Sequence, residues 1–104
     1  VGFNEWSTLG VGMAIKELGL KERVCAIGFD NNTECVGMLE TGELDTLIVQ
    51  NPFSMGYLAV MNAANILSGK KTESVIKTDV YVVDRSNMFS ADVQKILFGF
   101  DKYD

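Results

Sequence analysis

The chain has 104 residues, 47% of them hydrophobic and 22% charged, which is the composition of a globular core and not of a disordered tail. Its formal net charge of -5 argues against a nucleic-acid-binding surface, which needs lysine and arginine clustered on one face. The absence of histidine excludes Ser/His/Asp and Cys/His nucleophilic sites, together with every zinc site that contains histidine.

The first segment predicts a very short strand and then a helix. Because the chain begins at Val1 without a methionine and this strand is nearly absent, we expect a fragment or a processed piece of a longer protein. After Asn4, apolar residues recur at the spacing of one helical face: Val11, Ala14, Ile15 and Leu18. Gly19 is expected to end this helix in a left-handed conformation.

Asn4 to Ser7 therefore lie at a helix N-terminus, where exposed backbone N–H groups favour oxygen-rich ligands. The ordinary role of Asn4 and Ser7 at such a place is N-capping, and we expect Ser7 to do only that. Trp6 either covers the edge of the core or presents a flat apolar face beside a polar rim.

The central stretch is the apolar run from Val24 to Phe29, which ends in Asp30 and reads as a buried parallel strand. Open α/β sheets bind ligands at the carboxyl ends of their strands, so Asp30 is a candidate ligand residue. An aspartate before a helix is often a cap. Here Asn31 and Glu34 match the capping-box spacing, and Asn31 and Asn32 can cap in its place, which leaves Asp30 free.

The next buried strand runs from Thr46 to Val49 and stops at Gln50, before Asn51 and Pro52 impose a bend. Two other short apolar runs also end on polar residues: Gly2-Phe3 stops at Asn4, and Val24 to Phe29 stops at Asp30. We therefore predict that Asn4, Asp30 and Gln50 face one rim of the sheet.

The helix from Phe53 to about Ser68 is apolar nearly all round, with Asn62 and Asn65 its only clearly polar positions in the second half. A helix of this kind is buried on more than one side. A fragment with three or four strands cannot supply both sides, so we expect this helix to pack against something outside the 104 residues.

The rest of the chain predicts an edge strand from Val75 to Asp84, a short helix capped by Ser90, and a frayed tail from Phe100 to Asp104. Strands and helices alternate throughout, which indicates an α/β fold with a doubly wound parallel sheet. Cys25 in the central strand and Cys35 in the next helix are expected to be buried free thiols, although the sequence leaves a disulfide between them open.

Four motifs resemble, in order and spacing, the C-terminal part of type I periplasmic sugar-binding proteins, the ribose/galactose-binding family of ABC importers. They are Ile27-Gly28-Phe29-Asp30, Gln50-Asn51-Pro52-Phe53, Met55-Gly56-Tyr57 and Leu67-Ser68-Gly69-Lys70. The similarity extends from Asn4 to about Leu97. It implies that residues 1–104 are a C-terminal lobe fragment of a two-lobe periplasmic-binding-protein-like fold, with the helix in 53–69 packed on the missing N-terminal lobe. Hinge residues would lie near Gln50 to Pro52 and before Val75.

By position in this family, Asn4 looks like the amide ligand, Asp30 like the hydroxyl-binding aspartate and Gln50 like the glutamine near the hinge. The implied ligand is a monosaccharide or related polyol, and no cofactor or metal is implied. Many members have an aspartate after the asparagine, whereas this chain has Glu5-Trp6. Trp6 would stack on a pyranose face, or enlarge or occlude the site.

The leading hypothesis is the solute-binding component of an ABC sugar importer, which closes about a hinge, does no chemistry on the ligand and docks on a membrane permease. It implies a periplasmic or extracellular location, with or without a lipid anchor. The alternative is the effector-binding core of a cytoplasmic lac-repressor-like regulator, and a third possibility is a sensor-kinase ectodomain. An enzyme is not expected, because the rim lacks histidine and a glycine-rich phosphate loop. The isolated piece is expected to bind sugars poorly and could dimerise through 53–69.

Overall fold

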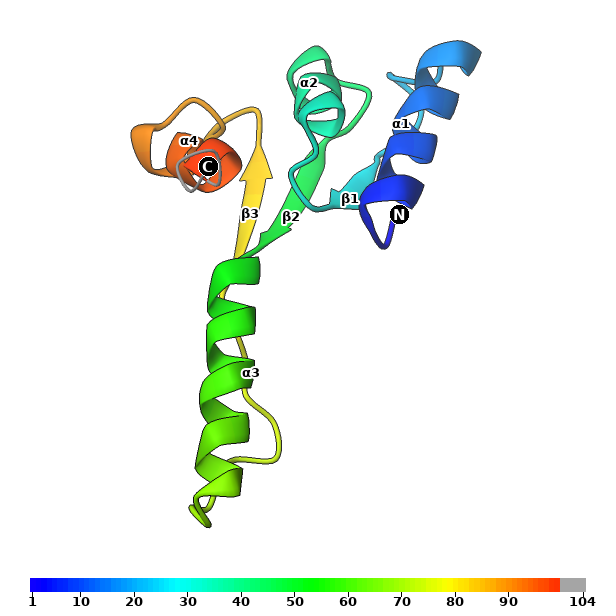
Figure 1. Cartoon of the computed structure of the whole chain (residues 1–104). Coiled ribbons are helices and arrows are strands. Elements are labelled where there is room, and N and C mark those ends of the chain that lie inside the picture. The colour runs from blue at the N-terminus through cyan, green and yellow to red at the C-terminus, as the bar shows by residue number, and fades with distance from the viewer. Residues whose placement is uncertain (100–104) are drawn as a thin grey trace. The chain divides into compact units, whose positions relative to one another are not determined.

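The computed structural model describes residues 1–99, and the tail expected from Phe100 to Asp104 lies outside them. Helices and strands alternate along the chain (Figure 1). The elements are α1 (Glu5–Leu18), β1 (Ile27–Phe29), α2 (Thr33–Thr41), β2 (Thr46–Gln50), α3 (Pro52–Leu67), β3 (Val80–Asp84) and α4 (Ala91–Phe98). Two compact units form: one contains residues 1–49 and the chain from Tyr81 on, and the other contains residues 50–80.

The sheet has the strand order β1-β2-β3. β1 and β2 are parallel, with Phe29 opposite Ile48, whereas the arrow of β3 points against that of β2 in Figure 1. The α/β class is confirmed, as is the edge position of β3, but the sheet is mixed and not entirely parallel. The strand expected from Val75 begins only at Val80, because β2 ends at Gln50 and leaves residues 75–79 without a strand to pair with.

β1 is also shorter than the sequence predicts, since Val24 and Cys25 are exposed and precede the strand. The N–H of Ala26 donates to the Oδ2 atom of Asp45 at 2.8 Å, so a side chain and not a neighbouring strand receives it. On the other side of β1, the N–H of Gly2 donates to the carbonyl of Ile27 at 2.9 Å. The residues before Asn4 therefore run beside β1 without forming a full strand.

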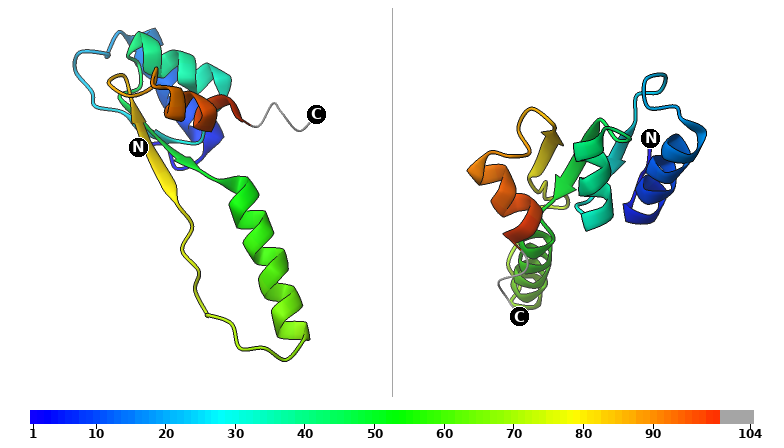
Figure 2. Two further views of the ribbon diagram at one scale, coloured as in Figure 1. Left: turned by 90° about the vertical axis from the view of Figure 1, so that its left-hand side faces the viewer. Right: turned by 90° about the horizontal axis from the view of Figure 1, so that it is seen from above.

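The core of the first unit lies on one face of the sheet. Side chains alternate along a strand, and the fully buried ones are Leu47 and Val49 of β2 and Val83 of β3. They cluster with residues from three helices, among them Ile15, Leu39 and Leu97, and α4, α2 and α1 follow one another along the sheet in Figures 1 and 2. On the alternate face, Val82 is 59% exposed. An open face of this kind is what a fragment of a doubly wound lobe has.

The buried stripe of α1 differs from the predicted one. Thr8, Gly12 and Ile15 are buried, whereas Leu18 is 70% exposed. The reason is a close approach of helix and sheet: a Cβ built on Gly28 of β1 would overlap the Cγ2 atom of Thr8. A hydrophobic pattern gives weight to large apolar side chains and misses a contact made by threonine and glycine. The predicted left-handed cap at Gly19 is confirmed, with φ of 62°.

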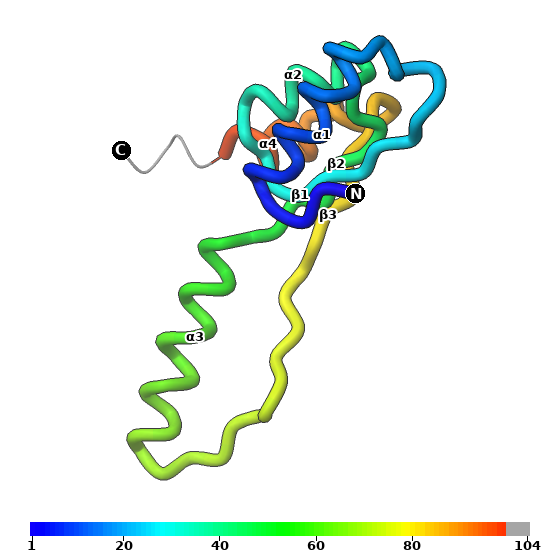
Figure 3. The backbone as a smooth tube through the Cα atoms, turned by 90° about the vertical axis from the view of Figure 1, so that its right-hand side faces the viewer, coloured from blue at the N-terminus to red at the C-terminus, as the bar shows by residue number. Residues whose placement is uncertain are grey.

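The second unit consists of α3 and the extended segment that returns from it (Figure 3). Asn51 caps α3, since its Oδ1 atom accepts from the N–H of Ser54 at 3.0 Å. The predicted helix is confirmed, and none of its residues is buried. Val60 is 70% exposed and Leu67 is 89% exposed. Between helix and returning segment lies an open groove of about 380 Å³, lined by residues that include Leu58, Ile66 and Ile76.

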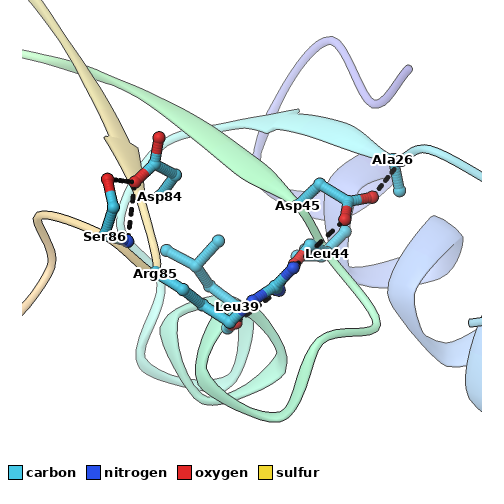
Figure 4. Close-up of polar contacts among 7 residues, drawn as sticks. All are labelled: Ala26, Leu39, Leu44, Asp45, Asp84, Arg85 and Ser86. Carbon is cyan, nitrogen blue, oxygen red and sulfur yellow. Dashed lines mark hydrogen bonds and ion pairs between the residues drawn. The ribbon is translucent and has the colours of Figure 1, made fainter.

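A polar cluster joins the residues just before β2 to those just after β3 (Figure 4). The Arg85 guanidinium donates to the carbonyl of Leu39 at 3.1 Å and to that of Leu44 at 2.9 Å. It also pairs with Asp45 at 3.3 Å. Leu39 is in the last turn of α2, where carbonyls lack partners within the helix. Arg85 therefore links α2 and β2 to the edge strand.

Among the helices of residues 1–99, none combines the length and apolar character needed to cross a membrane.

Candidate functional site

Asp30 follows the last residue of β1, as predicted, and is half-buried. Its N–H donates to the carbonyl of Ile48 in β2 at 2.9 Å. Its φ of 72° makes it the only residue other than glycine in the left-handed region within residues 1–99. That conformation costs roughly 1 to 2 kcal/mol for an ordinary residue, somewhat less for aspartate, and such strain tends to be held where function needs it.

The Asp30 carboxylate makes no hydrogen bond or ion pair with any residue of the described chain. Asn32 caps α2 in its place, because the Oδ1 atom of Asn32 accepts from the N–H of Glu34 at 2.9 Å. The expectation that an asparagine and not Asp30 caps this helix is confirmed. The capping box expected at Asn31 is wrong, since the Asn31 amide donates to the carbonyl of Leu97 at 2.7 Å. Asp30 is left available for a ligand.

Asn4 is the N-cap of α1, which confirms the ordinary role weighed for it. Its Oδ1 atom accepts from the N–H of Ser7 at 2.9 Å and from the Ser7 hydroxyl at 2.8 Å. The N–H of Asn4 donates in return to the Ser7 Oγ atom at 3.0 Å. Within residues 1–99 the Nδ2 group of Asn4 has no partner, so this exposed side chain keeps a donor for a ligand.

Trp6 lies two residues beyond Asn4 in the first turn of α1 and is 73% exposed. Its ring therefore does not cover the edge of the core, which was one of the two roles weighed for it. An exposed indole beside polar groups is the arrangement that the other role, an apolar face for a ring, requires. Stacking of Trp6 on a sugar stays a prediction.

Gln50 is the half-buried last residue of β2 and begins the second unit. Its convergence with Asn4 and Asp30 stays a prediction. In the first unit, the start of α1 and the loop after β1 are joined, because the Asn32 amide donates to the Glu5 carboxylate at 2.6 Å. Glu5 was not predicted as a site residue, although a glutamate where many members of the resembled family have an aspartate was an available signal.

Three carboxylates lie near enough to the buried Cys35 thiol for their charges to act on it. Burial raises the pKa of Cys35, and the charges of Glu5, Glu34 and Asp30 raise it further. No lysine or arginine pairs with these carboxylates in the part of the chain that the structure describes. Cys35 is a buried free thiol as predicted, but Cys25 is exposed, and neither forms a disulfide. The rim is therefore rich in acceptors and negatively charged.

Comparison with known proteins gives a consistent result. The model of the family described as "Periplasmic binding protein domain" matches residues 1–71. The ribose import binding protein RbsB of Haemophilus influenzae is 32% identical over 80 residues, which are 77% of this chain and 27% of that protein.

Two solved structures show the same similarity in three dimensions. A carbohydrate transporter solute binding protein from Agrobacterium radiobacter, in complex with D-arabinose, has a TM-score of 0.79 and 33% identity. The match covers 91% of this chain and 32% of that one. An ABC transporter solute binding protein from Agrobacterium vitis with bound D-fucose has a TM-score of 0.79 and 34% identity, over 93% of this chain and 33% of that one. The chain thus spans about a third or less of the length of these relatives.

Proposed function

The chain belongs to the family of periplasmic binding protein domains, and from that membership we propose that it binds a neutral monosaccharide as part of the solute-binding component of an ABC importer. The observation that carries the proposal is Asp30, a half-buried carboxylate without a described partner, fixed in the left-handed conformation at the end of β1. The ligand is bound reversibly and is not transformed. Because the curated relatives are import binding proteins, the importer is favoured over a transcription regulator.

The side chains suit a polyol. The Asp30 carboxylate can accept hydrogen bonds from two neighbouring hydroxyls, and amides such as those of Asn4 and Gln50 can both donate and accept. Hydrogen bonds to an ionised group are the stronger kind. A sugar that lacks one of these hydroxyls leaves a buried polar group unpaired, and this is how the site discriminates. Trp6 adds an apolar face for the ring.

The charge of the rim restricts the ligand class. Glu5, Asp30 and Glu34 are all acidic, and none forms an ion pair with a described lysine or arginine. A sugar phosphate or a uronic acid would bring a second negative charge into this field, at a cost that grows as the site closes and water leaves. A neutral sugar avoids this repulsion.

We infer that the chain is part of the C-terminal lobe and that α3 is the surface that meets the N-terminal lobe. Two observations support it: no residue of α3 is buried, and the relatives are about three times as long. Closure of the lobes about the connections near Gln50 to Pro52 and before Val75 would bury the sugar and create the surface that the permease recognises. The location that follows is the periplasm or the cell exterior. Dimerisation through 53–69 is expected only where the N-terminal lobe is absent.

Calorimetric titration of the two-lobed protein with D-ribose, D-arabinose and D-fucose tests this function. We expect at least one sugar to bind, and Asp30→Ala to weaken its affinity by roughly a hundredfold, because a charged hydrogen-bonding group is lost. Asp92→Ala is the matched control, since this aspartate on α4 is 94% exposed. Equal binding by the Asp30→Ala variant and the unmodified protein would contradict the assignment.

A further inference from the structure

We propose that Asn31 and Asn32 are positioning residues that hold Asp30 ready for the sugar. The inference rests on the proposed function, since Asp30 is the residue proposed there to bind the sugar. The two asparagines need not touch the sugar themselves. Both follow Asp30 directly in the loop between β1 and α2. Each uses its amide to reach a different helix.

Asn31 connects the loop to α4. Its Nδ2 group donates to the carbonyl of Leu97 at 2.7 Å. Leu97 lies in the last turn of α4 and is only 2% exposed, so its carbonyl is among those that have no partner within the helix and little access to water. The Asn31 amide satisfies this carbonyl and fixes the residue next to Asp30 against the core.

Asn32 connects the loop to two helices at once. Its Oδ1 atom caps α2 through the N–H of Glu34, and its Nδ2 group donates to the Glu5 carboxylate of α1 at 2.6 Å. Glu5 is in the first turn of α1, where the helix dipole favours a negative charge. The second bond is therefore charge-assisted, and it joins the loop to the segment that carries Asn4 and Trp6.

Together these bonds fix the backbone at a strained residue and at the two residues that follow it. Asp30 itself is bonded to β2, the next residue to α4, and the one after it to α1 and α2. A residue in the left-handed region persists only where its surroundings over-determine it. A carboxylate that is already in place binds more tightly, because the free protein does not have to reach the competent conformation first.

Two variants of unchanged size test the proposal: Asn31→Asp and Asn32→Asp. Each removes one amide donor, and Asn32→Asp keeps the oxygen that caps α2 while placing a carboxylate against Glu5. Asn87→Asp is the matched control, because the Asn87 amide also donates to a backbone carbonyl of the first unit, that of Val82, at 3.0 Å. It lies in the turn after β3, outside the loop that carries Asp30.

The readouts are the affinity of the two-lobed protein for whichever of D-ribose, D-arabinose and D-fucose it binds, and hydrogen exchange of the Asp30 amide. We expect each loop variant to weaken binding of that sugar about tenfold, as the competent state falls to about a tenth of the population. Exchange at Asp30 should accelerate by a similar factor while that of Leu47 in the core stays unchanged. The Asn87→Asp control should move neither readout. The double variant Glu5→Gln with Asn32→Asp should recover both, since the glutamine amide can donate to the new carboxylate.

Loop variants that match the unmodified protein in affinity and in Asp30 exchange would overturn the proposal. So would an Asn32→Asp defect that Glu5→Gln fails to repair, or a loss that appears equally in the Asn87→Asp control. If the unmodified protein binds none of the three sugars, the proposed function fails, and faster exchange at Asp30 then still decides whether the two asparagines hold it.

Discussion

Replacing Arg85 by methionine tests which contacts stabilise the first unit at the end of the sheet opposite to Asp30. Two charge-assisted hydrogen bonds, to the carbonyls of Leu39 and Leu44, are lost. A hydrogen bond to a charged group contributes about 1.5 to 3 kcal/mol where water is excluded. The Arg85 side chain is 46% exposed, so water recovers part of that, and its ion pair with Asp45 adds only about 0.2 to 1 kcal/mol at such a site. We expect a total loss of about 2 to 3 kcal/mol.

Urea unfolding followed by circular dichroism measures this loss, which corresponds to a decrease in Tm of roughly 10 °C for a chain of this size. Arg85→Lys should retain only part of the stabilisation, because one ammonium replaces two guanidinium nitrogens: Nη1, which donates to both carbonyls, and Nη2, which pairs with Asp45. Asp45→Asn should cost less than 1 kcal/mol, since an amide oxygen can still accept from Ala26. An Arg85→Met variant whose free energy of unfolding lies within about 0.5 kcal/mol of the unmodified chain would show that these bonds do not hold the unit together. An Asp45→Asn variant that is equally damaging would show the same.

Two further predictions concern glycine and cysteine residues. Gly28→Ala should lower the free energy of unfolding by about 1 to 3 kcal/mol, because the added Cβ would overlap the Thr8 side chain. A Cβ added at Gly37 would have no atom within 4 Å, so Gly37→Ala should raise the free energy of unfolding by about 0.5 to 1 kcal/mol through helix propensity. Unfolding curves in which Gly28→Ala is the more stable of the two variants would contradict this packing. In the native chain, Ellman's reagent should react with the exposed Cys25 and spare Cys35, whose thiol is buried with a raised pKa, until denaturant is added. Two thiols that react equally fast without denaturant would show that Cys35 is accessible.

The ends of helices and strands that depend on residues close in sequence were predicted correctly. Asn51 and Pro52 mark the start of α3, and Gly19 ends α1 as expected. Asp30 at the end of β1 was also predictable, because an apolar run of strand length that stops at an acid is read directly from the sequence. The apolar character of α3 indicated a helix that needs a partner; none of its residues is buried, and its partner stays a prediction.

The misses come from contacts between residues distant in the chain. The bonds from Asn32 to Glu5 and from Asn31 to Leu97 span 27 and 66 residues, and no local spacing encodes them. The inward face of α1 was misjudged because Gly28 lets the backbone of the sheet approach Thr8, which hydrophobicity does not score. β1 and β3 were predicted too long, since a strand requires a neighbour as well as a suitable sequence.

The most direct test of the central claim is a crystal structure of the two-lobed protein with a bound monosaccharide. The proposal predicts that the Asp30 carboxylate accepts hydrogen bonds from hydroxyls of the sugar, and that Asn4 and Gln50 bond to the same molecule. A sugar bound with its hydroxyls out of reach of Asp30, or held by other residues of the chain, would contradict it.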